Sequence, residues 1–578
     1  MEIEKTILKR ANRWLGGSFD DETKIAVKRL METNPVELTD SFYRDLEFGT
    51  GGLRGIMGVG TNRMNKYTVG MATQGLANYL MQMFPDKNPV KMAISYDSRN
   101  NSKYFALIVA EVLSANGFRV YLFSDLRPTP ELSFAIRHLE CQSGVMVTAS
   151  HNPKEYNGYK AYWDDGAQMI APHDENVITE VQKITSIDDV RWTAVPENII
   201  SIGAEIDRKY LDLVLALSLS PDSIRRQKNL KIVYTPLHGC GRELVPRILS
   251  MYGFEDIHMV KEQAIADGNF PTVHSPNPEE HDALDMAINL AAELHADLVM
   301  ATDPDADRVG IAVRNHKNEM ILLNGNQTAA ILFYYILNRW KELDKIRGNE
   351  FIVSTIVTTK LLSEITASFG VTYYECLTGF KYIADVIRQH EGQNQFIVGG
   401  EESYGYLIGD FVRDKDAVSA CALIAETAAW MADQGKSLFE LLVEIYQKYG
   451  FFKESLISVT RKGKSGAEEI QQMMVDYRNS PPRVINNSKV VKIMDYQLQV
   501  EKDLATGITK TIGLPKSNVL QFFLEDGSII SVRPSGTEPK IKFYFGVCEQ
   551  IANIADFEHT EHRLDNKIAS IIASLKLK

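Results

Sequence analysis

One loop of the chain holds a serine in the position that a nucleophile would take. Ser150 lies in the segment Thr148-Ala-Ser-His-Asn-Pro153, directly after an apolar run at residues 144–147. Loops held by rigid strands are favoured positions for catalytic groups, and Asn-Pro and Asn-Gly pairs are typical of turns. His151 and Lys160 follow, and they could donate to a phosphate or move a proton. The alternative is an ordinary surface turn, but the length of the polar segment favours the nucleophile.

A second loop spaces three carboxylates two residues apart. They belong to Asp303, Asp305 and Asp307. A loop can turn all three onto one hard cation such as Mg²⁺. An EF-hand begins with the same alternation, but it needs glycine and glutamate where Arg308 and Arg314 stand. A solvated acidic turn is the other alternative, and the strand expected at residues 297–300, which would aim the loop, argues against it. We therefore predict one magnesium site, with Arg308 beside it for a phosphorylated ligand.

Two further loops could hold a sugar phosphate. The segment Arg533-Pro-Ser-Gly-Thr-Glu-Pro-Lys540 combines a bidentate donor, hydroxyl groups and a glycine whose neighbouring amides can face an anion. It predicts a phosphate clamp, although a proline-rich turn would have a similar composition. The segment Gly400-Glu-Glu-Ser-Tyr-Gly405 offers carboxylate and hydroxyl groups that suit pairs of sugar hydroxyls. Taken alone, it is weak evidence.

A glycine-rich segment near the amino terminus is not a dinucleotide-binding loop. Gly49-Thr-Gly-Gly-Leu-Arg-Gly55 departs from the G-x-G-x-x-G spacing, and no clear strand precedes it. We interpret Arg54 as a further cation that faces a phosphate. The sequence has no Walker A motif, so nucleotide-driven phosphoryl transfer lacks its usual cradle.

These loops follow a rhythm of strand, helix, strand, helix and strand that occurs three times. In each set the third strand leads to a polar loop, which holds Ser150, Asp303 or Glu401. The strands are expected at residues 92–96, 120–123 and 145–147, then 231–234, 257–260 and 298–300, then 351–353, 371–374 and 396–398. This alternation predicts α/β domains with mainly parallel sheets, whose carboxyl-end loops are the usual ligand positions. It also favours an internal duplication, although many α/β proteins share the rhythm.

The two ends of the chain differ from this pattern. Apolar runs at residues 519–524 and 529–532 flank an Asp-Gly turn and predict an antiparallel hairpin, hence a fourth, α+β domain. The amino terminus has helical spacing of Ile3, Ile7, Leu8, Ala11 and Leu15 and predicts a packed amphipathic helix. We predict domains at residues 1–204, 205–317, 318–450 and 451–578.

Composition excludes several classes of protein. The 578 residues are 44% apolar and 24% charged, which is typical of a globular chain. No stretch is long enough to span a bilayer, and the amino terminus lacks the apolar core of a signal peptide. Five dispersed cysteines suggest neither a disulfide framework nor a zinc site, so a reducing cytoplasm fits best. A net charge of -12 disfavours nucleic acid and anionic membranes, so an anionic substrate needs a local basic pocket.

Together these segments resemble the α-D-phosphohexomutase superfamily, and within it the long phosphoglucomutase branch that also contains phosphopentomutases and sugar-bisphosphate synthases. The serine loop TASHNP, the metal loop DPDADR, the sugar loop GEESYG and the phosphate loop RPSGTEP occur in order across nearly the whole chain. The resemblance implies three similar α/β domains and a C-terminal α+β domain around a central cleft, to which each domain lends one loop.

The resemblance also implies a role for each motif residue. Ser150 would be carried as phosphoserine, with Mg²⁺ between its phosphate and the three aspartates, and Arg54 and Lys160 would lie beside that phosphate. Arg308, Glu401 and Ser403 match positions that meet the sugar, and Lys381 in Thr378-Gly379-Phe380-Lys381 matches one from the loop of the third domain. All of these, with Thr378 and Gly379, would bind the substrate. The clamp for the phosphate that does not react is matched by Arg533, Ser535, Gly536 and Thr537.

The implied activity is the interconversion of glucose 1-phosphate and glucose 6-phosphate, with glucose 1,6-bisphosphate as intermediate and activator. The alternatives are a phosphopentomutase acting on ribose or deoxyribose 1-phosphate, a phosphomannomutase, a sugar-bisphosphate synthase, and a sugar-phosphate-binding regulator that lacks catalysis. The sugar loop departs from the GEMSGH pattern of bacterial phosphomannomutase/phosphoglucomutase, because Tyr404 and Gly405 occupy the region of its histidine. This departure disfavours mannose and leaves His151 and Lys160 as candidates for the general acid and base. Whether the chain works as a monomer or a homodimer stays open.

Overall fold

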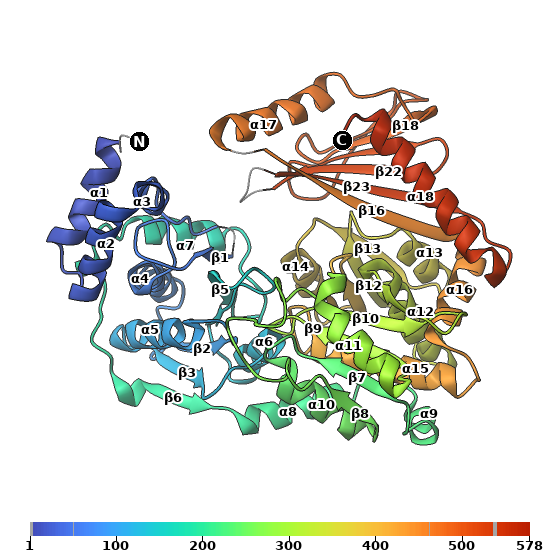
Figure 1. The fold of residues 1–578 in the computed structure, drawn as a ribbon, viewed down its shortest axis with the longest axis horizontal. Coiled ribbons are helices and arrows are strands. Elements are labelled where there is room, and N and C mark those ends of the chain that lie inside the picture. Colours follow the sequence, from blue (N-terminus) through green and yellow to red (C-terminus); the bar gives the residue numbers. More distant parts are fainter. Residues whose placement is uncertain (1–3, 50, 462, 536–539, 578) are drawn as a thin grey trace.

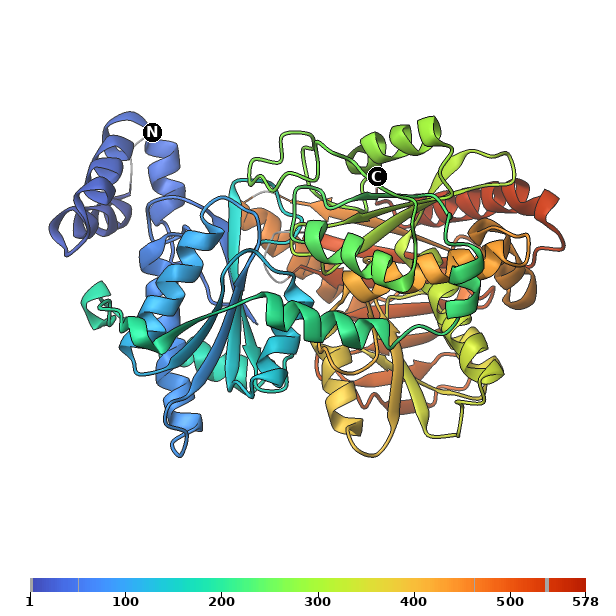
Figure 2. The same cartoon turned by 90° about the horizontal axis from the view of Figure 1, so that it is seen from below.

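A computed structural model describes residues 4–49, 51–461, 463–535 and 540–577. Its strands form four sheets that follow one another along the chain, each covered by helices (Figure 1). The first sheet lies at the left of Figure 1, the second and third lie at the right, and the fourth lies above them. Seen from below, the amino-terminal helices project beyond the first sheet (Figure 2). Among the described residues, no helix combines the length and the apolar character needed to cross a bilayer.

The amino-terminal extension is helical, as its spacing predicted. It consists of α1 (Lys5–Gly16), α2 (Asp21–Thr33) and α3 (Pro35–Phe42). Ile7 and Ala11 are buried as expected, while Ile3 lies outside the described residues. Trp14, which the pattern did not single out, stacks on Phe19 with ring centroids 4.4 Å apart. These helices share a small core of their own, which Tyr67 and Ile187 of the following unit join.

The first sheet has a parallel part and an antiparallel edge. Its order is β1-β5-β4-β2-β3-β6. The parallel strands are β2 (Lys91–Tyr96), β3 (Arg119–Phe123), β4 (Ser143–Val147) and β6 (Ile199–Ile202), and the antiparallel ones are β1 (Gly52–Ile56) and β5 (Tyr156–Trp163). The main helices are α4 (Lys66–Met83), α5 (Ser102–Ala115), α6 (Thr129–His138) and α7 (His173–Gln182).

The second sheet repeats this arrangement with the order β11-β10-β9-β7-β8. Parallel strands β7 (Ile232–Thr235), β8 (Ile257–Met259) and β9 (Leu298–Thr302) are followed by antiparallel β10 (Val309–Arg314) and β11 (Met320–Leu323). The helices are α8 (Ala204–Leu215), α9 (Pro221–Arg226), α10 (Gly241–Tyr252) and α11 (His281–Leu294).

The third sheet has the order β13-β12-β14-β15. Parallel strands β12 (Glu350–Thr355), β13 (Thr372–Cys376) and β14 (Gln395–Gly400) are followed by antiparallel β15 (Tyr406–Ile408). Its helices are α12 (Gly325–Glu342), α13 (Leu361–Ser368), α14 (Phe380–His390), α15 (Ala417–Ala432) and α16 (Leu438–Tyr449).

One topology recurs in these three sheets, and it positions the candidate loops. Each of the nine predicted strands is present, and in every sheet the third strand of a set pairs with the first, which pairs with the second. An antiparallel return strand follows the third strand each time: β5, β10 or β15. The loops after β4, β9 and β14 therefore occupy equivalent places, at the carboxyl ends of parallel strands where ligands usually bind.

The fourth sheet is antiparallel, as the hairpin predicted. Strand β21 (Leu520–Leu524) pairs with β22 (Ile529–Pro534). The sheet also contains β16 (Phe451–Thr460), β18 (Ser488–Asp495), β19 (Val500–Asp503), β20 (Thr509–Thr511) and β23 (Lys540–Glu549), while β17 (Val484–Ile485) pairs with β18. Helices α17 (Gly463–Asn479) and α18 (Phe557–Ser574) flank it (Figure 1).

Candidate active site

The serine loop leaves β4 through a strained backbone conformation. Ser150 has a φ of 51°, in the left-handed region that residues other than glycine rarely enter, and it is 4% exposed. Its amide N–H donates to Thr148 Oγ1 (2.8 Å), and the Thr148 hydroxyl donates to Asp97 Oδ2 (2.7 Å). Its own Oγ donates to Asp303 Oδ2 (2.6 Å) and lies 3.2 Å from His151 Nδ1. The loop therefore holds the serine hydroxyl against the acidic loop of the second sheet.

A buried arginine that the sequence did not single out fixes this loop. The Arg99 guanidinium donates to backbone carbonyls of the loop and of the residues that follow it. These carbonyls belong to Ser150, Asn152, Pro153 (2.9 Å) and Tyr156 (3.2 Å). Arg99 is 3% exposed and also lies 3.4 Å from Asp97. Arg99 stands two residues after Asp97, in the loop that follows β2. That position at the carboxyl end of a parallel strand is the feature from which the sequence analysis could have identified it.

The three aspartates of the second loop are buried together and suit a metal ion. Each offers a carboxylate oxygen within 4.8 Å of the others. Asp303 Oδ1 accepts the amide N–H groups of Asp307 (3.1 Å) and Arg308 (3.0 Å), which leaves Oδ2 toward Ser150. Asp305 Oδ1 and Asp307 Oδ1 are buried and have no hydrogen-bond partner among the described residues. Because buried carboxylate oxygens without a hydrogen bond are costly, a hard divalent cation would match this set of donors.

Two lysines neutralise part of this charge. Lys160 Nζ, from β5, lies 2.7 Å from Asp305 Oδ2 and 3.3 Å from Asp307 Oδ2. Lys415 Nζ lies 3.1 Å from Asp307 Oδ2. Burial opposes the charge of Asp307, but Lys415 and Lys160 outweigh it and hold the pKa of that carboxyl well below its usual range. Lys415 was missed by the sequence analysis, because a basic residue between two aspartates is usually solvated.

The remaining predicted residues beside the serine are Arg54 and His151. Arg54 lies on β1, and its Nη1 donates to Asn152 Oδ1 (3.3 Å) in the serine loop. His151 accepts the Ser275 hydroxyl at its backbone carbonyl (2.9 Å). Burial, together with Arg308 and Arg54, lowers the pKa of the His151 imidazole well below its usual value, so the ring is neutral at physiological pH.

The sugar loop meets the metal loop through Arg308. Its Nη1 donates to the Ser403 carbonyl (3.0 Å) and also bonds Glu279. Glu401 is 5% exposed and accepts the Gly379 amide at Oε1 (2.9 Å). The loops that hold Asp303, Glu401 and Gly379 therefore converge, although they follow different strands.

A cleft of about 290 Å³ lies where the first, third and fourth sheets meet. Its lining includes the predicted residues Thr378, Gly379, Lys381 and Arg533. Arg533 faces Lys542 across the β22–β23 pair, and burial and Arg533 lower the pKa of Lys542. Lys542 is a further cation that the sequence analysis did not name. Ser535 donates its amide to the Lys540 carbonyl (2.7 Å), while Gly536 and Thr537 lie outside the described residues.

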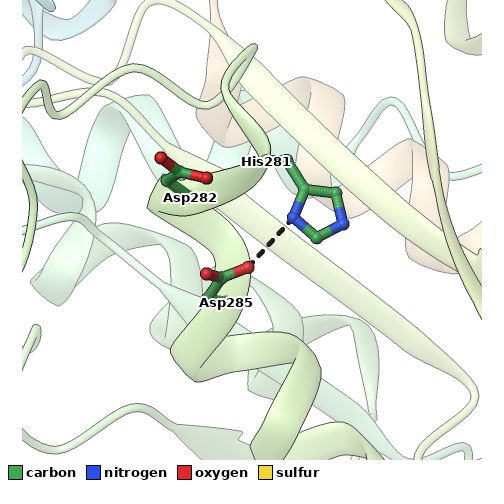
Figure 3. Close-up of side chains that lie close together, drawn as sticks. All are labelled: His281, Asp282 and Asp285. Atoms are coloured by element: carbon green, nitrogen blue, oxygen red, sulfur yellow. Dashed lines mark hydrogen bonds and ion pairs between the residues drawn. The ribbon is translucent and has the colours of Figure 1, made fainter.

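A second group of metal-binding residue types lies at the start of α11. His281, Asp282 and Asp285 approach one another, and His281 Nδ1 lies 3.0 Å from Asp285 Oδ1 (Figure 3). All three side chains are exposed, in contrast to the buried aspartates of the metal loop. Because water already solvates them, we assign no site here.

Family models of known proteins match four stretches of the chain. The models describe phosphoglucomutase/phosphomannomutase alpha/beta/alpha domains I, II and III and the C-terminal domain. They match residues 45–188, 208–317, 324–449 and 483–561, respectively.

Curated relatives and solved structures agree with these models. The chain is 36% identical over 535 residues to a phosphoglucomutase of Staphylococcus haemolyticus, covering 91% of this chain and 94% of the relative. It is 38% identical over 525 residues to a phosphoglucomutase of Staphylococcus aureus, with coverage of 91% and 94%. In fold it resembles the open form of Paramecium parafusin, a phosphoglucomutase, with a TM-score of 0.67, 18% identity and coverage of 92% and 96%. A phosphoglucomutase/phosphomannomutase family protein of Burkholderia thailandensis gives a TM-score of 0.63 at 17% identity, with coverage of 89% and 96%.

Three related α/β units, an antiparallel fourth unit and a serine held against an acidic loop define a phosphoryl-transfer enzyme built around a cleft. The chain belongs to the phosphoglucomutase/phosphomannomutase family. It is thus a phosphohexomutase, an enzyme of the isomerase class.

Proposed function

We propose that the enzyme interconverts glucose 1-phosphate and glucose 6-phosphate through a phosphoserine at Ser150 and glucose 1,6-bisphosphate. The observation that carries this proposal is the 2.6 Å contact between Ser150 Oγ and Asp303 Oδ2, at the edge of a buried cluster of aspartates. The curated relatives, of whose length this chain covers 94%, are phosphoglucomutases.

The serine end of the site supplies charge stabilisation. We assign Asp303, Asp305 and Asp307, with the phosphate on Ser150, as the ligands of one Mg²⁺, which would neutralise charge on the phosphoryl group. Lys160 and Arg54 would add positive charge beside the oxygen atoms of that phosphoryl group. These fixed charges suit phosphoryl transfer, whose catalysis rests mainly on positioning and electrostatics.

The transfer itself breaks one phosphorus–oxygen bond and forms another. The free hydroxyl of the hexose monophosphate attacks the phosphorus and gives its proton to a base, while the bond to Ser150 Oγ breaks and that oxygen takes up a proton. The bisphosphate then turns in the cleft, and its other phosphoryl group returns to Ser150. His151 Nδ1, 3.2 Å from Ser150 Oγ, can take the serine proton in that return step. Burial lowers the pKa of Lys160, but Asp305 and Asp307 outweigh it and raise that pKa above its usual value, so Lys160 carries a proton and is the candidate acid that protonates the released sugar oxygen.

The other end of the site orients the ligand. We assign substrate binding to Arg308, Thr378, Gly379, Lys381, Glu401 and Ser403, of which Arg308, Glu401 and Ser403 would meet the sugar. We assign the phosphate that does not react to Arg533, Ser535, Gly536 and Thr537. One clamp of this kind can hold a phosphate on either end of the sugar, so the same residues serve both half-reactions. Closure of the fourth unit over the ligand would exclude water that could hydrolyse the phosphoserine.

The proposal also includes the bounds of the domains and the cellular compartment. We propose that the four domains run over residues 1–204, 205–317, 318–450 and 451–578, with the cleft between them. The five cysteines are free thiols, which fits work in a reducing cytoplasm on small sugar phosphates.

Specificity constants for competing sugars test this function. We would measure kcat/KM for glucose, mannose and ribose 1-phosphates with Mg²⁺ and a trace of the matching bisphosphate. A value for glucose 1-phosphate well above the others is expected. A higher value for ribose 1-phosphate would reassign the enzyme as a phosphopentomutase, and binding without turnover of any sugar would leave only a sugar-phosphate-binding regulator.

A further inference from the structure

The cleft between the first, third and fourth sheets contains two polar side chains that no motif includes. Gln168 reaches it from the first sheet unit, and Ser517 reaches it from a loop of the fourth. Neither side chain makes a hydrogen bond to another described residue, although both lie beside Lys381 and Arg533 in the lining. A ligand that enters this cleft therefore meets donors from three separate units.

The chemistry of the lining selects an anion. It holds the cations Lys381 and Arg533, the hydroxyl of Thr378 and the two side chains above, and none of the described residues that line it is an acid. Thr378 Oγ1 is buried and has no hydrogen-bond partner among the described residues. Because phosphate oxygens accept several donors at once, cations with amide and hydroxyl donors suit a phosphate better than a sugar ring.

The lysine in this cleft is held only loosely. Lys381 Nζ lies 3.4 Å from Asp174 Oδ2, at the long end of an ion pair, and 5.4 Å from the centroid of the Tyr382 ring, and its side chain is 12% exposed. Lys381 can therefore turn toward an incoming anion while Asp174 keeps it near the cleft.

A tight hairpin fixes the position of Gln168. It follows β5, and its backbone forms a bridge with Tyr162, while the Trp163 amide donates to the Ala167 carbonyl (2.8 Å). Gly51, with a φ of +100°, passes beside it, so that a Cβ at that glycine would lie 3.9 Å from Gln168 Cδ. Gly51 thus lies behind the Gln168 side chain, which itself lines the cleft.

We propose that Gln168 and Ser517 bind the phosphate of the substrate that is not being transferred. The Gln168 amide N–H and the Ser517 hydroxyl donate to its oxygens, beside Lys381 and Arg533. The inference rests on the proposed mutase function and adds residues to it. It also means that residues of the first and fourth units contact one phosphate, so the ligand itself links the two units.

Substitutions at Gln168 separate hydrogen bonding from packing. Gln168→Met keeps the length of the side chain but removes its donor, and Gln168→Glu places a negative charge beside the phosphate. We expect kcat/KM for glucose 1-phosphate to fall about tenfold or more in the Met variant, and further in the Glu variant. Ser517→Ala should also lower kcat/KM for glucose 1-phosphate. The control Gln389→Ala changes an exposed glutamine of α14 and should have the kcat/KM of the wild type.

A second readout excludes a general structural defect. Radiolabelled phosphoenzyme would be discharged either to glucose 1-phosphate or to glucose, which lacks the phosphate in question. Discharge to glucose should be the same in wild type and variants, while discharge to glucose 1-phosphate should slow. Unchanged kcat/KM in Gln168→Met and Ser517→Ala, or equal slowing with both acceptors, would overturn the inference. Absence of turnover by the wild-type enzyme would instead reject the proposed function.

Discussion

Ser150 Oγ donates to Asp303 Oδ2 at 2.6 Å across a sequence separation of 153 residues. The two residues follow equivalent strands, β4 and β9, in two sheets of the same topology. Asp303 uses its other oxygen to accept the Asp307 and Arg308 amides, so its orientation is set by its own loop. The nucleophile and the acidic cluster are thus arranged by backbone geometry rather than by flexible side chains.

Ser150→Ala should abolish mutase activity, because the oxygen that carries the phosphoryl group is gone. The fold should survive, since the backbone carbonyl that Arg99 holds is unchanged. Incorporation of radiolabel from glucose 1,6-bisphosphate and turnover of glucose 1-phosphate would be measured together. A variant with full activity would remove the phosphoserine mechanism.

Asp305→Asn should reduce kcat at least about a hundredfold, because it removes one charged ligand from the proposed metal site. Activity as a function of added Mg²⁺ is the measurement, and the half-saturating concentration should rise. Asp282→Asn is a matched control from the exposed group at the start of α11, and it should behave as the wild type. An unaltered Mg²⁺ dependence in Asp305→Asn would contradict the assigned ligands.

Arg99→Lys should slow catalysis although it preserves the charge. A lysine ammonium cannot copy the planar fork that holds the carbonyls of Ser150, Pro153 and Tyr156. Each buried carbonyl left without a donor should cost about 1 to 3 kcal/mol of stability. We expect a lower melting temperature and a lower rate of phosphoserine formation, with Arg225→Lys, at an exposed arginine, as the unaffected control. A melting temperature and a rate equal to those of the wild type would show that Arg99 is dispensable.

The strands and functional loops could be predicted from the sequence because each joins an apolar run to a polar turn. The direction of the return strands could not. Strand β5 follows the serine loop and runs antiparallel to β4, yet an apolar run carries no information about the strand with which it pairs. The sheets are therefore mixed at one edge, where the alternation of strands and helices predicted mainly parallel pairing.

The residues that sequence reasoning missed are single charged side chains whose role depends on burial. Arg99, Lys415 and Lys542 belong to none of the four motifs, and a basic residue outside a motif is usually solvated. Their importance appears only when loops from different sheets meet, as when Lys415 lies 3.1 Å from Asp307. Contacts between distant segments of this kind cannot be read from local spacing.

Glu454 should make the stability of the enzyme depend on pH. It lies on β16, and burial raises the pKa of its carboxyl from 4.5 to about 7, against the hydrogen bonds of Thr359 and Asn326. Because the folded pKa is the higher one, the folded chain binds the proton more tightly than the unfolded chain does. The stabilisation is thus fully present below about pH 4.5 and is lost as the pH rises through about 7.

The neutral variant Glu454→Gln tests this dependence. A pKa shift of this size corresponds to at most about 3 kcal/mol, so the effect on melting should be measurable. Melting temperatures of wild type and variant would be compared at pH 5 and pH 8. We expect the melting temperature of the variant to rise relative to that of the wild type between pH 5 and pH 8, because a glutamine never has to ionise within the buried site. Parallel pH profiles for the two proteins would mean that Glu454 ionises in the folded state at its ordinary pKa.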